Sequence, residues 1–207
     1  GQLSAQEGPA QPFEVRDFVL QADGRWSPHG IAATLQTLRL QAKAFGLPRT
    51  DLILEAGLTP ERFDLKRLQV NLPQSELRGR GSLTMADQQL QFRLEIPHLQ
   101  LDEFPITLPP DLPTQVQGAI TANGSLRAPR VEARLTYAGA QIGADLEAQL
   151  QESLPRYQAK LRIESLNVAR LSPTMAGEIQ ATLQFQGSGF TEEQRRATLN
   201  LAVDSRN

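Results

Sequence analysis

Cysteine is absent from this chain, and aromatic residues make up only 5% of it. The lack of cysteine excludes disulfides, thiolate metal sites and cysteine nucleophiles. A compact core normally uses bulky aromatic side chains, whereas the apolar residues here are mostly leucine, alanine, valine and isoleucine. No apolar run approaches the ~20 residues that a membrane-spanning helix needs. The sequence contains no secretory signal peptide, and a trimmed or processed chain would have lost one.

The charge balance and the histidines also point to no nucleic-acid or metal site. The formal net charge is -2 and the sequence pI is about 5.8. No basic cluster accompanies stacking aromatics, so a nucleic-acid partner is not expected. The chain has two histidines, His29 in a predicted turn and His98 beside Pro97. Without cysteine or a second histidine nearby, neither predicts a metal site.

Motifs for catalysis are also lacking. Gly79 and Gly81 are not followed by GK[ST] or by a helix pattern, so they do not predict a phosphate-binding loop. We interpret them as strand residues whose missing side chains leave space for neighbouring side chains on a crowded face. Acidic residues such as Asp145 and Glu147 are interleaved with apolar ones, which is typical of a solvated sheet face. Ser125 follows Asn123-Gly124 in a predicted turn with no nucleophile elbow around it. The chain is therefore not expected to be an enzyme, and no cofactor is expected.

The clearest positive signal is an alternation of apolar and polar residues in 114–150. The alternation runs from Val116 to Leu126, restarts at Val131 after Ala128-Pro129, and restarts at Ile142 after Ala138-Gly139. A period of two predicts strands with one apolar and one wet face, whereas a helix needs apolar residues at spacings of three and four.

Similar runs of about 5–9 residues recur roughly a dozen times between turn signals, which predicts an all-β protein of antiparallel strands joined by short hairpins. Residues 31–47 fit either a helical face or a strand, and we favour a strand because the neighbouring segments are strands. The alternation slips by one residue between Leu65 and Leu68, which predicts a β-bulge. Asp23-Gly24 predicts a tight turn, and Leu166 predicts a strand separate from the one before it.

Composition divides the chain into four parts. Residues 1–12 are small and polar and predict a linker or disordered leader. Residues 105–113 hold four prolines and predict a stiff crossover. The strand-rich segments 13–104 and 114–207 lie on either side of it. The chain begins with Gly1 rather than Met, so we expect a piece of a longer or processed protein.

The predicted apolar face leaves two possibilities open. Alternating residues normally face the core of a closed sandwich or barrel. Here, many alanines and few aromatics on successive strands would instead pave a wide surface, and no amphipathic helix is available to cover it. A long antiparallel sheet with one apolar face must fold on itself or hold something apolar, and a sheet curled into a trough would hold acyl chains.

One stretch of the chain follows the pattern GxLxxxGxLxxPxVxAxL, with Gly118, Ile120, Gly124, Leu126, Pro129, Val131, Ala133 and Leu135 at its fixed positions. Before it, Leu99–Pro105 leads into the proline-rich crossover, and Tyr157–Leu161 and Leu166–Leu171 follow it. With these features, the residues from about 60 to 204 resemble the repeats of the AsmA-like superfamily, most of all the TamB family, the inner-membrane component of the translocation and assembly module.

The resemblance implies a β-taco, an elongated antiparallel sheet curled into a U-shaped trough with a hydrophobic inner face. It also implies an interior piece of a bridge across the periplasm, anchored in the inner membrane through other parts of the parent protein. Such a bridge carries phospholipid toward the outer membrane and supports outer-membrane biogenesis. Pairing with an Omp85-type outer-membrane barrel is expected only through other parts of the parent protein, and this piece is itself expected to be soluble.

On this interpretation the ligands are phospholipid acyl chains, and the alternating apolar residues form the groove. The alternatives are a chaperone-like or structural module that pairs through its sheet edges with outer-membrane proteins, and a closed sandwich that binds no lipid. The predicted groove residues are Phe92, Leu94, Ile96, Val116, Ile120, Ala122, Leu126, Val131, Ala133, Leu135, Tyr137, Ile142, Ala144, Leu146, Ala148, Leu150, Tyr157, Leu161, Ile163, Ile179, Leu183 and Phe185.

Overall fold

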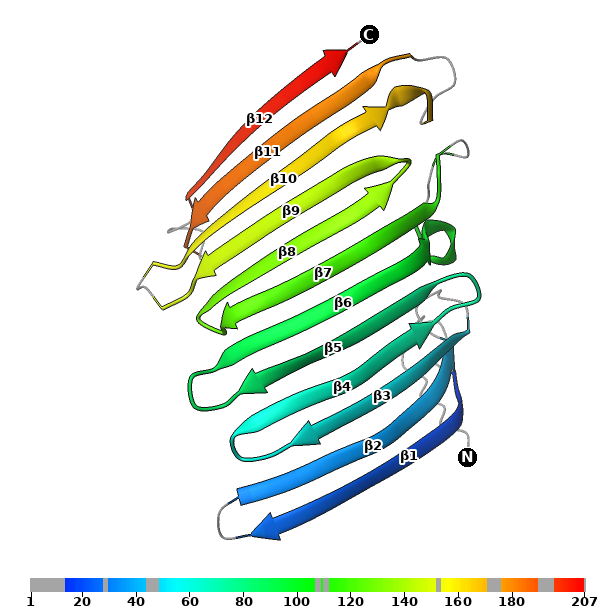
Figure 1. Cartoon of the computed structure of the whole chain (residues 1–207), viewed down its shortest axis with the longest axis vertical. Helices are drawn as coiled ribbons and strands as arrows, with labels where there is room; N and C mark the ends of the chain where they lie inside the picture. The colour runs from blue at the N-terminus through cyan, green and yellow to red at the C-terminus, as the bar shows by residue number, and fades with distance from the viewer. Residues whose placement is uncertain are drawn as a thin grey trace, which may run out of the picture.

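A single antiparallel sheet of twelve strands makes up the computed structural model, with the strands in the same order in space as in the sequence (Figure 1). The structure describes residues 14–27, 30–43, 49–106, 109, 112–151, 154–170, 176–189 and 196–206. The predicted all-β antiparallel fold is confirmed.

The strands are β1 (Glu14–Ser27), β2 (Gly30–Lys43), β3 (Thr50–Leu58), β4 (Arg62–Asn71), β5 (Glu76–Thr84), β6 (Gln89–Gln100), β7 (Gln115–Ser125), β8 (Ala128–Tyr137), β9 (Ala140–Gln149), β10 (Arg156–Asn167), β11 (Glu178–Ser188) and β12 (Arg196–Arg206), with short 3-10 turns η1 (Leu101–Glu103) and η2 (Val168–Arg170).

The strands are longer than the alternation predicts, because several predicted breaks lie inside them. β1 and β2 each have 14 residues, whereas the alternation predicts runs of about 5–9. The turn predicted at Asp23-Gly24 is wrong, since both residues pair with β2 inside β1. Leu166 does not begin a new strand but belongs to β10. The ambiguous segment 31–47 is a strand up to Lys43, as we predict, and its remainder lies outside the described residues, as does the predicted leader.

Turns and bulges set the register of the sheet. The bulge predicted in β4 is confirmed, because Leu65 pairs with Gly81 while Leu68 pairs with Gly79, leaving two residues of β4 opposite one residue of β5. Further register shifts occur in β6 and β10. A bulge bends its strand and increases the local twist, so these shifts favour a curved sheet over a flat one. β8 and β9 are joined by Ala138-Gly139, both with positive φ, as a tight two-residue hairpin requires.

The predicted crossover does not interrupt the sheet. β6 and β7 pair directly on either side of it, and the Leu101 amide donates to the Thr114 carbonyl at 2.8 Å. Residues 107–108 and 110–111 of this connection lie outside the described part of the chain. Segments 13–104 and 114–207 therefore contribute to one continuous sheet.

A small network of hydrogen bonds links two turns at the end of the sheet next to this connection. Ser75, between β4 and β5, is only 2% exposed. Its hydroxyl donates to the Glu103 carboxylate of η1 and accepts the Gln100 amide at 2.8 Å. The Gln74 amide donates to the other Glu103 oxygen at 2.7 Å. These bonds tie the β4–β5 turn to the end of β6 and satisfy the buried hydroxyl.

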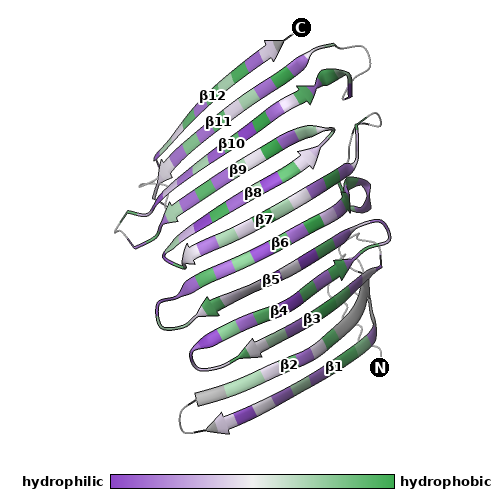
Figure 2. Cartoon of the chain, viewed as in Figure 1, coloured by the Kyte–Doolittle hydropathy of each residue, from purple (hydrophilic) through white to green (hydrophobic). Residues whose placement is uncertain are grey.

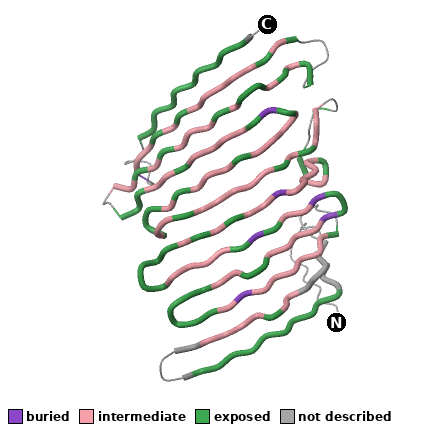
Figure 3. The backbone as a smooth tube through the Cα atoms, in the orientation of Figure 1, coloured by how far each residue is buried: buried purple, intermediate pink, exposed green. Residues whose placement is uncertain are grey.

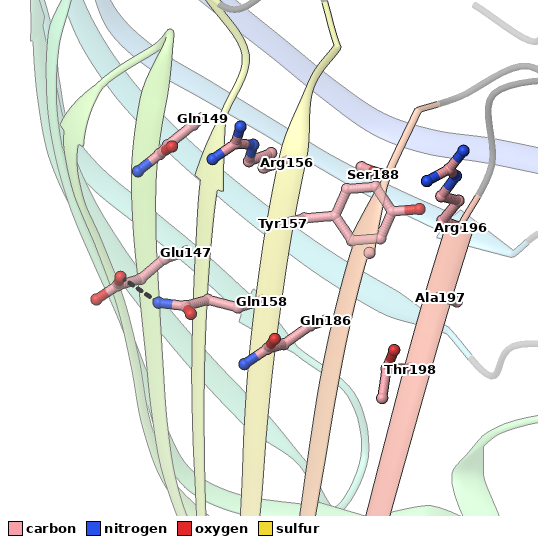
Figure 4. A pocket seen from close by; sticks show the side chains of 11 residues that line it. Glu147, Gln149, Arg156, Tyr157, Gln158, Gln186, Ser188, Arg196, Ala197 and Thr198 are labelled. Carbon is pink, nitrogen blue, oxygen red and sulfur yellow. Dashed lines mark hydrogen bonds between the residues drawn. The ribbon is translucent and has the colours of Figure 1, made fainter.

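No second layer covers the sheet within the described residues. Close packing between strands is confined to neighbours in the ladder, and β1 and β12 do not pair with each other, so the sheet is not closed into a barrel. The sheet is curled, and its N-terminal strands pass behind the C-terminal strands in Figure 4. Most of the backbone is accordingly half-buried or exposed (Figure 3). The fold is an elongated, curled sheet, consistent with the predicted trough, and the buried apolar side chains of its described part are Ala56, Leu72, Ile96 and Ala140.

We predict that Gly118→Ala destabilises the sheet by roughly 1–3 kcal/mol, the typical cost of a strained backbone. Gly118 has a φ of 149°, and an added Cβ would collide with the carbonyl oxygen of Arg134 and lie 2.8 Å from the Cα of Leu135. The measurement is the free energy of unfolding by urea. Gly143→Ala is the matched control, because a Cβ there meets nothing within 4 Å. Equal effects of the two substitutions would contradict the packing seen around Gly118.

Candidate functional site

The strand register gathers the apolar side chains into rows that cross the whole sheet. Cross-strand partners lie on the same face, so each row follows directly from the pairing. The first row takes one residue from each strand: Leu20, Leu38, Leu54, Leu68, Gly79, Leu94, Ile120, Ala133, Ala144, Leu161, Leu183 and Leu201. The second, beside it, is Ala22, Leu35, Ala56, Leu65, Gly81, Phe92, Ala122, Val131, Leu146, Ala159, Phe185 and Leu199. Neither row contains a polar or charged side chain.

We call the surface that carries these two rows the apolar face. Figure 2 shows the same alternation as stripes of apolar and polar residues along each strand. The curl gives the two faces different surroundings. In Figure 4 Glu147 points out of the curl, whereas Tyr157 on the adjacent strand points the other way. The apolar face therefore lines the inside of the curl and the polar face its outside.

The predicted groove residues share this face, apart from two in turns. Leu126 and Leu150 lie just beyond β7 and β9, 43% and 40% exposed, and their amides donate to the carbonyls of Gln88 and Arg127. Eleven of the predicted residues are members of the two rows. Those that continue the alternation on the same strands beyond the rows are Ile96, Val116, Leu135, Tyr137, Ile142, Ala148, Tyr157, Ile163 and Ile179.

The prediction missed the part of the face that lies on β1–β5 and β12. Leu20, Leu38 and Leu54 continue the first row toward the N-terminus, and Leu201 continues it on the last strand. The signal that identifies them is the same alternation, which is visible in the sequence there too. Their assignment to the same face needs the pairing register, which the alternation within single strands does not supply.

The apolar face is open to solvent to a degree that ordinary cores do not show. Leu146 lies in the interior of the sheet and is still 43% exposed. Toward the β12 edge the exposure rises, to 63% for Leu199 and 66% for Leu201. Large contiguous exposed apolar surfaces mark binding sites for partners, ligands or membranes.

Aromatic side chains give the face one locally ordered cluster. The rings of Tyr157 and Phe185 stack with centroids 5.7 Å apart. Gly187, paired with Tyr157, leaves the room that the tyrosine ring fills, since an added Cβ would overlap that ring. The Tyr157 hydroxyl donates to the Gly189 carbonyl at 3.4 Å. The polar tip of the tyrosine is thereby directed to the end of the strand, away from the apolar rows.

The polar face carries ion pairs and shallow hollows. Arg130 pairs with Glu147 across β8 and β9, and a hollow of about 470 Å³ lies over Glu147 and the glutamines of β10 and β11 (Figure 4). Arg78 donates two hydrogen bonds to Glu76, at 2.7 and 3.0 Å, and these hold the pKa of the Glu76 carboxyl below its ordinary value. The described residues contain no cluster of three or more His, Asp or Glu that would hold a metal ion.

Comparison with family models, curated proteins and solved structures finds no match for this chain. The TamB-like family assignment therefore stays a prediction based on the repeat residues. Among the described residues, no helix combines the length and apolar character needed to cross a membrane.

We predict that the native chain binds the dye 1-anilinonaphthalene-8-sulfonate, because no second layer covers the apolar face in the part of the chain that the structure describes. The expected result is strong dye fluorescence well below the unfolding midpoint, measured together with circular dichroism to show that the sheet is intact. A closed sandwich would raise dye fluorescence only on partial unfolding. Absence of fluorescence from the folded chain would show that another surface covers this face in solution.

Proposed function

We propose that this chain is a segment of a periplasm-spanning, bridge-like protein that carries phospholipid between the inner and outer membranes along its apolar face. The observation that supports this proposal is the pair of uncharged rows that cross all twelve strands, with no second layer over them among the described residues. The parent protein would be anchored in the inner membrane and would meet an Omp85-type barrel through other parts. Its role would be to support outer-membrane biogenesis.

The width of the face favours a conduit over a pocket for one small molecule. Neighbouring strands lie ~4.8 Å apart, so the sheet extends roughly 50 Å across its strands. The hydrocarbon core of a bilayer is ~30 Å thick and holds two acyl chains end to end, so a face of this width is longer than two acyl chains and has room for more than one lipid. A uniform apolar surface lets a chain shift from one site to the next without crossing a polar barrier, which transport requires and tight storage does not.

Energetics also favour acyl chains as the ligand. Burial stabilises each methylene by ~0.8 kcal/mol, so an acyl chain lying on the rows gains several kcal/mol from a few contacts per strand. Polar headgroups would find no hydrogen-bond partners on the two rows, since the side chains there carry no hydrogen-bonding groups. They would therefore remain at the rim of the curl, in water.

We predict that Leu183→Arg weakens lipid binding by about tenfold or more, since a charge in hydrocarbon costs roughly 2–3 kcal/mol. Leu183 lies in the first row between Leu161 and Leu201. Gln184→Arg is the matched control, because the next residue of β11 lies on the opposite face. Native mass spectrometry of the purified chain measures the bound lipid.

Four results of this experiment are informative. Lipid lost from Leu183→Arg and retained by Gln184→Arg supports the conduit. Lipid lost equally from both variants, or retained by both, contradicts it. If neither variant nor the native chain carries lipid, acyl chains do not occupy this face. Circular dichroism of each variant separates loss of binding from loss of fold.

A second candidate function is supported by the free edge of β12. This strand pairs with β11 over eleven consecutive residues without a register shift, whereas the β1–β2 pairing is interrupted twice. A long, regular edge strand is a template for another strand. On this alternative the protein is a chaperone-like module that pairs with unfolded outer-membrane barrel proteins.

Proline substitution tests the alternative. In an antiparallel pair, successive residues direct their amides to opposite sides, so either Asn200 or Leu201 points its amide to the free edge. We predict that one of Asn200→Pro and Leu201→Pro preserves the β11 ladder and the unfolding midpoint. If edge pairing is the function, this variant loses binding of an unfolded barrel protein in a fluorescence anisotropy assay, and Leu183→Arg keeps it. Binding retained by both proline variants would rule edge pairing out.

A further inference from the structure

Four cations lie side by side on the polar face, on the outside of the curl. Leu65 pairs with Gly81 and Leu68 with Gly79, so the bulge of β4 places both Lys66 and Arg67 opposite Arg80 of β5. Arg80 in turn pairs directly with Arg93 of β6. All four side chains are exposed. We call Lys66, Arg67, Arg80 and Arg93 the cation row.

Like charges in cross-strand register destabilise a sheet, so this arrangement needs a compensating partner. Part of the compensation is internal. Arg93 pairs with Glu95 at 2.9 Å, and Arg67 pairs with Glu55 at 3.6 Å. The structure shows no ion pair for Lys66 or Arg80 within the described residues. The net charge of the whole chain is -2, so the row does not reflect a generally basic protein.

The acidic counterpart on the same face shows what full compensation looks like. Glu132 of β8 lies directly opposite Asp145 of β9. Arg134 lies 3.8 Å from Glu132, and Arg162 lies 3.9 Å from Asp145. Each carboxylate of this like-charged pair therefore has its own cation. In the cation row, by contrast, Arg67 and Arg93 have carboxylate partners, whereas Lys66 and Arg80 have none among the described residues.

A hollow lies over the cation row. It has a volume of about 430 Å³, and its lining includes Lys66, Arg67, Arg78, Arg80 and Arg93, with Glu95 as the only carboxylate. The hollow therefore has room for a small anion above the row. Opposed residues of neighbouring strands have Cβ atoms only ~5 Å apart, so these long side chains can reach one anion together.

We infer that the cation row is a binding site for a phosphate group. Guanidinium groups bind phosphate oxygens in a two-pronged geometry, and the lysine ammonium adds a mobile point charge. Tetrahedral phosphate presents enough oxygens to take donors from three strands at once. The site is separate from the proposed lipid path, because it occupies the opposite face of the sheet. The phosphate can belong to a soluble molecule or to an anionic lipid headgroup.

The test measures the thermal unfolding midpoint of the full chain in pyrophosphate and in sodium chloride of equal ionic strength. The unfolding midpoint of the native chain is expected to rise more in pyrophosphate than in sodium chloride, because a ligand that binds only the folded state stabilises that state. Arg80→Gln is expected to lose at least half of that gain. Without added anion, Arg80→Gln is expected to unfold at a higher temperature than the native chain, because an uncompensated charge has been removed.

Lys66→Gln and Arg162→Gln complete the comparison. Lys66→Gln is expected to behave like Arg80→Gln. Arg162→Gln removes an outer-face arginine that lies outside the cation row, and it is expected to keep the full pyrophosphate response. The site is disproved if sodium chloride stabilises as well as pyrophosphate, or if Arg162→Gln loses as much of the response as Arg80→Gln.

Vesicles distinguish the two sources of phosphate. Cosedimentation is measured with phosphatidylcholine vesicles that contain or lack phosphatidylglycerol. Binding to the anionic vesicles that Arg80→Gln abolishes and Leu183→Arg preserves assigns the site to lipid headgroups. A pyrophosphate response without such vesicle binding assigns it to a soluble phosphate compound. Absence of both responses overturns the inference, whatever the outcome of the lipid experiment on the apolar face.

Discussion

Hydrogen bonding between adjacent strands is the interaction on which the rest of this structure depends. A sheet with no second layer has little interior, so stability comes from the backbone ladder and from side-chain contacts between opposed residues, each worth ~1 kcal/mol or less. Among the described residues the buried apolar side chains are those of Ala56, Leu72, Ile96 and Ala140. Residues on the apolar face therefore contribute less to folding than their hydrophobicity implies, and they remain available to bind a ligand.

The two faces of the sheet follow from this constraint. Because the ladder sets both faces at once, the pairing that aligns Leu94 with Ile120 also aligns Arg93 with Thr121. An uncharged row on one side thus has a polar row on the other, one residue away. A single-layer sheet can in this way carry two unrelated surfaces without any additional domain, and a substitution on one face leaves the other in place.

The sequence predicts the fold class, the direction of pairing and the part of the apolar face that lies on β6–β11, because a period of two is a local property of each strand. It also predicts the bulge after Leu65, because the alternation changes phase there. It fails at Asp23-Gly24, since a dipeptide that favours turns also fits within a long strand with a free edge. The cation row is invisible in the sequence, because Lys66, Arg80 and Arg93 come together only through the register of three strands.

The simple strand order has a consequence for how the protein folds and varies in length. Each strand packs closely only against its neighbours in the sequence. Contacts therefore join strands that are consecutive in the sequence, and their separation is small relative to the 207-residue chain, which favours rapid folding for a β protein. Such a chain is a quasi-one-dimensional system, whose stability is approximately a sum of nearest-neighbour terms. Adding or removing one hairpin changes the length of the sheet by two strands and repacks nothing else, so the reach of the surface can change without a new fold.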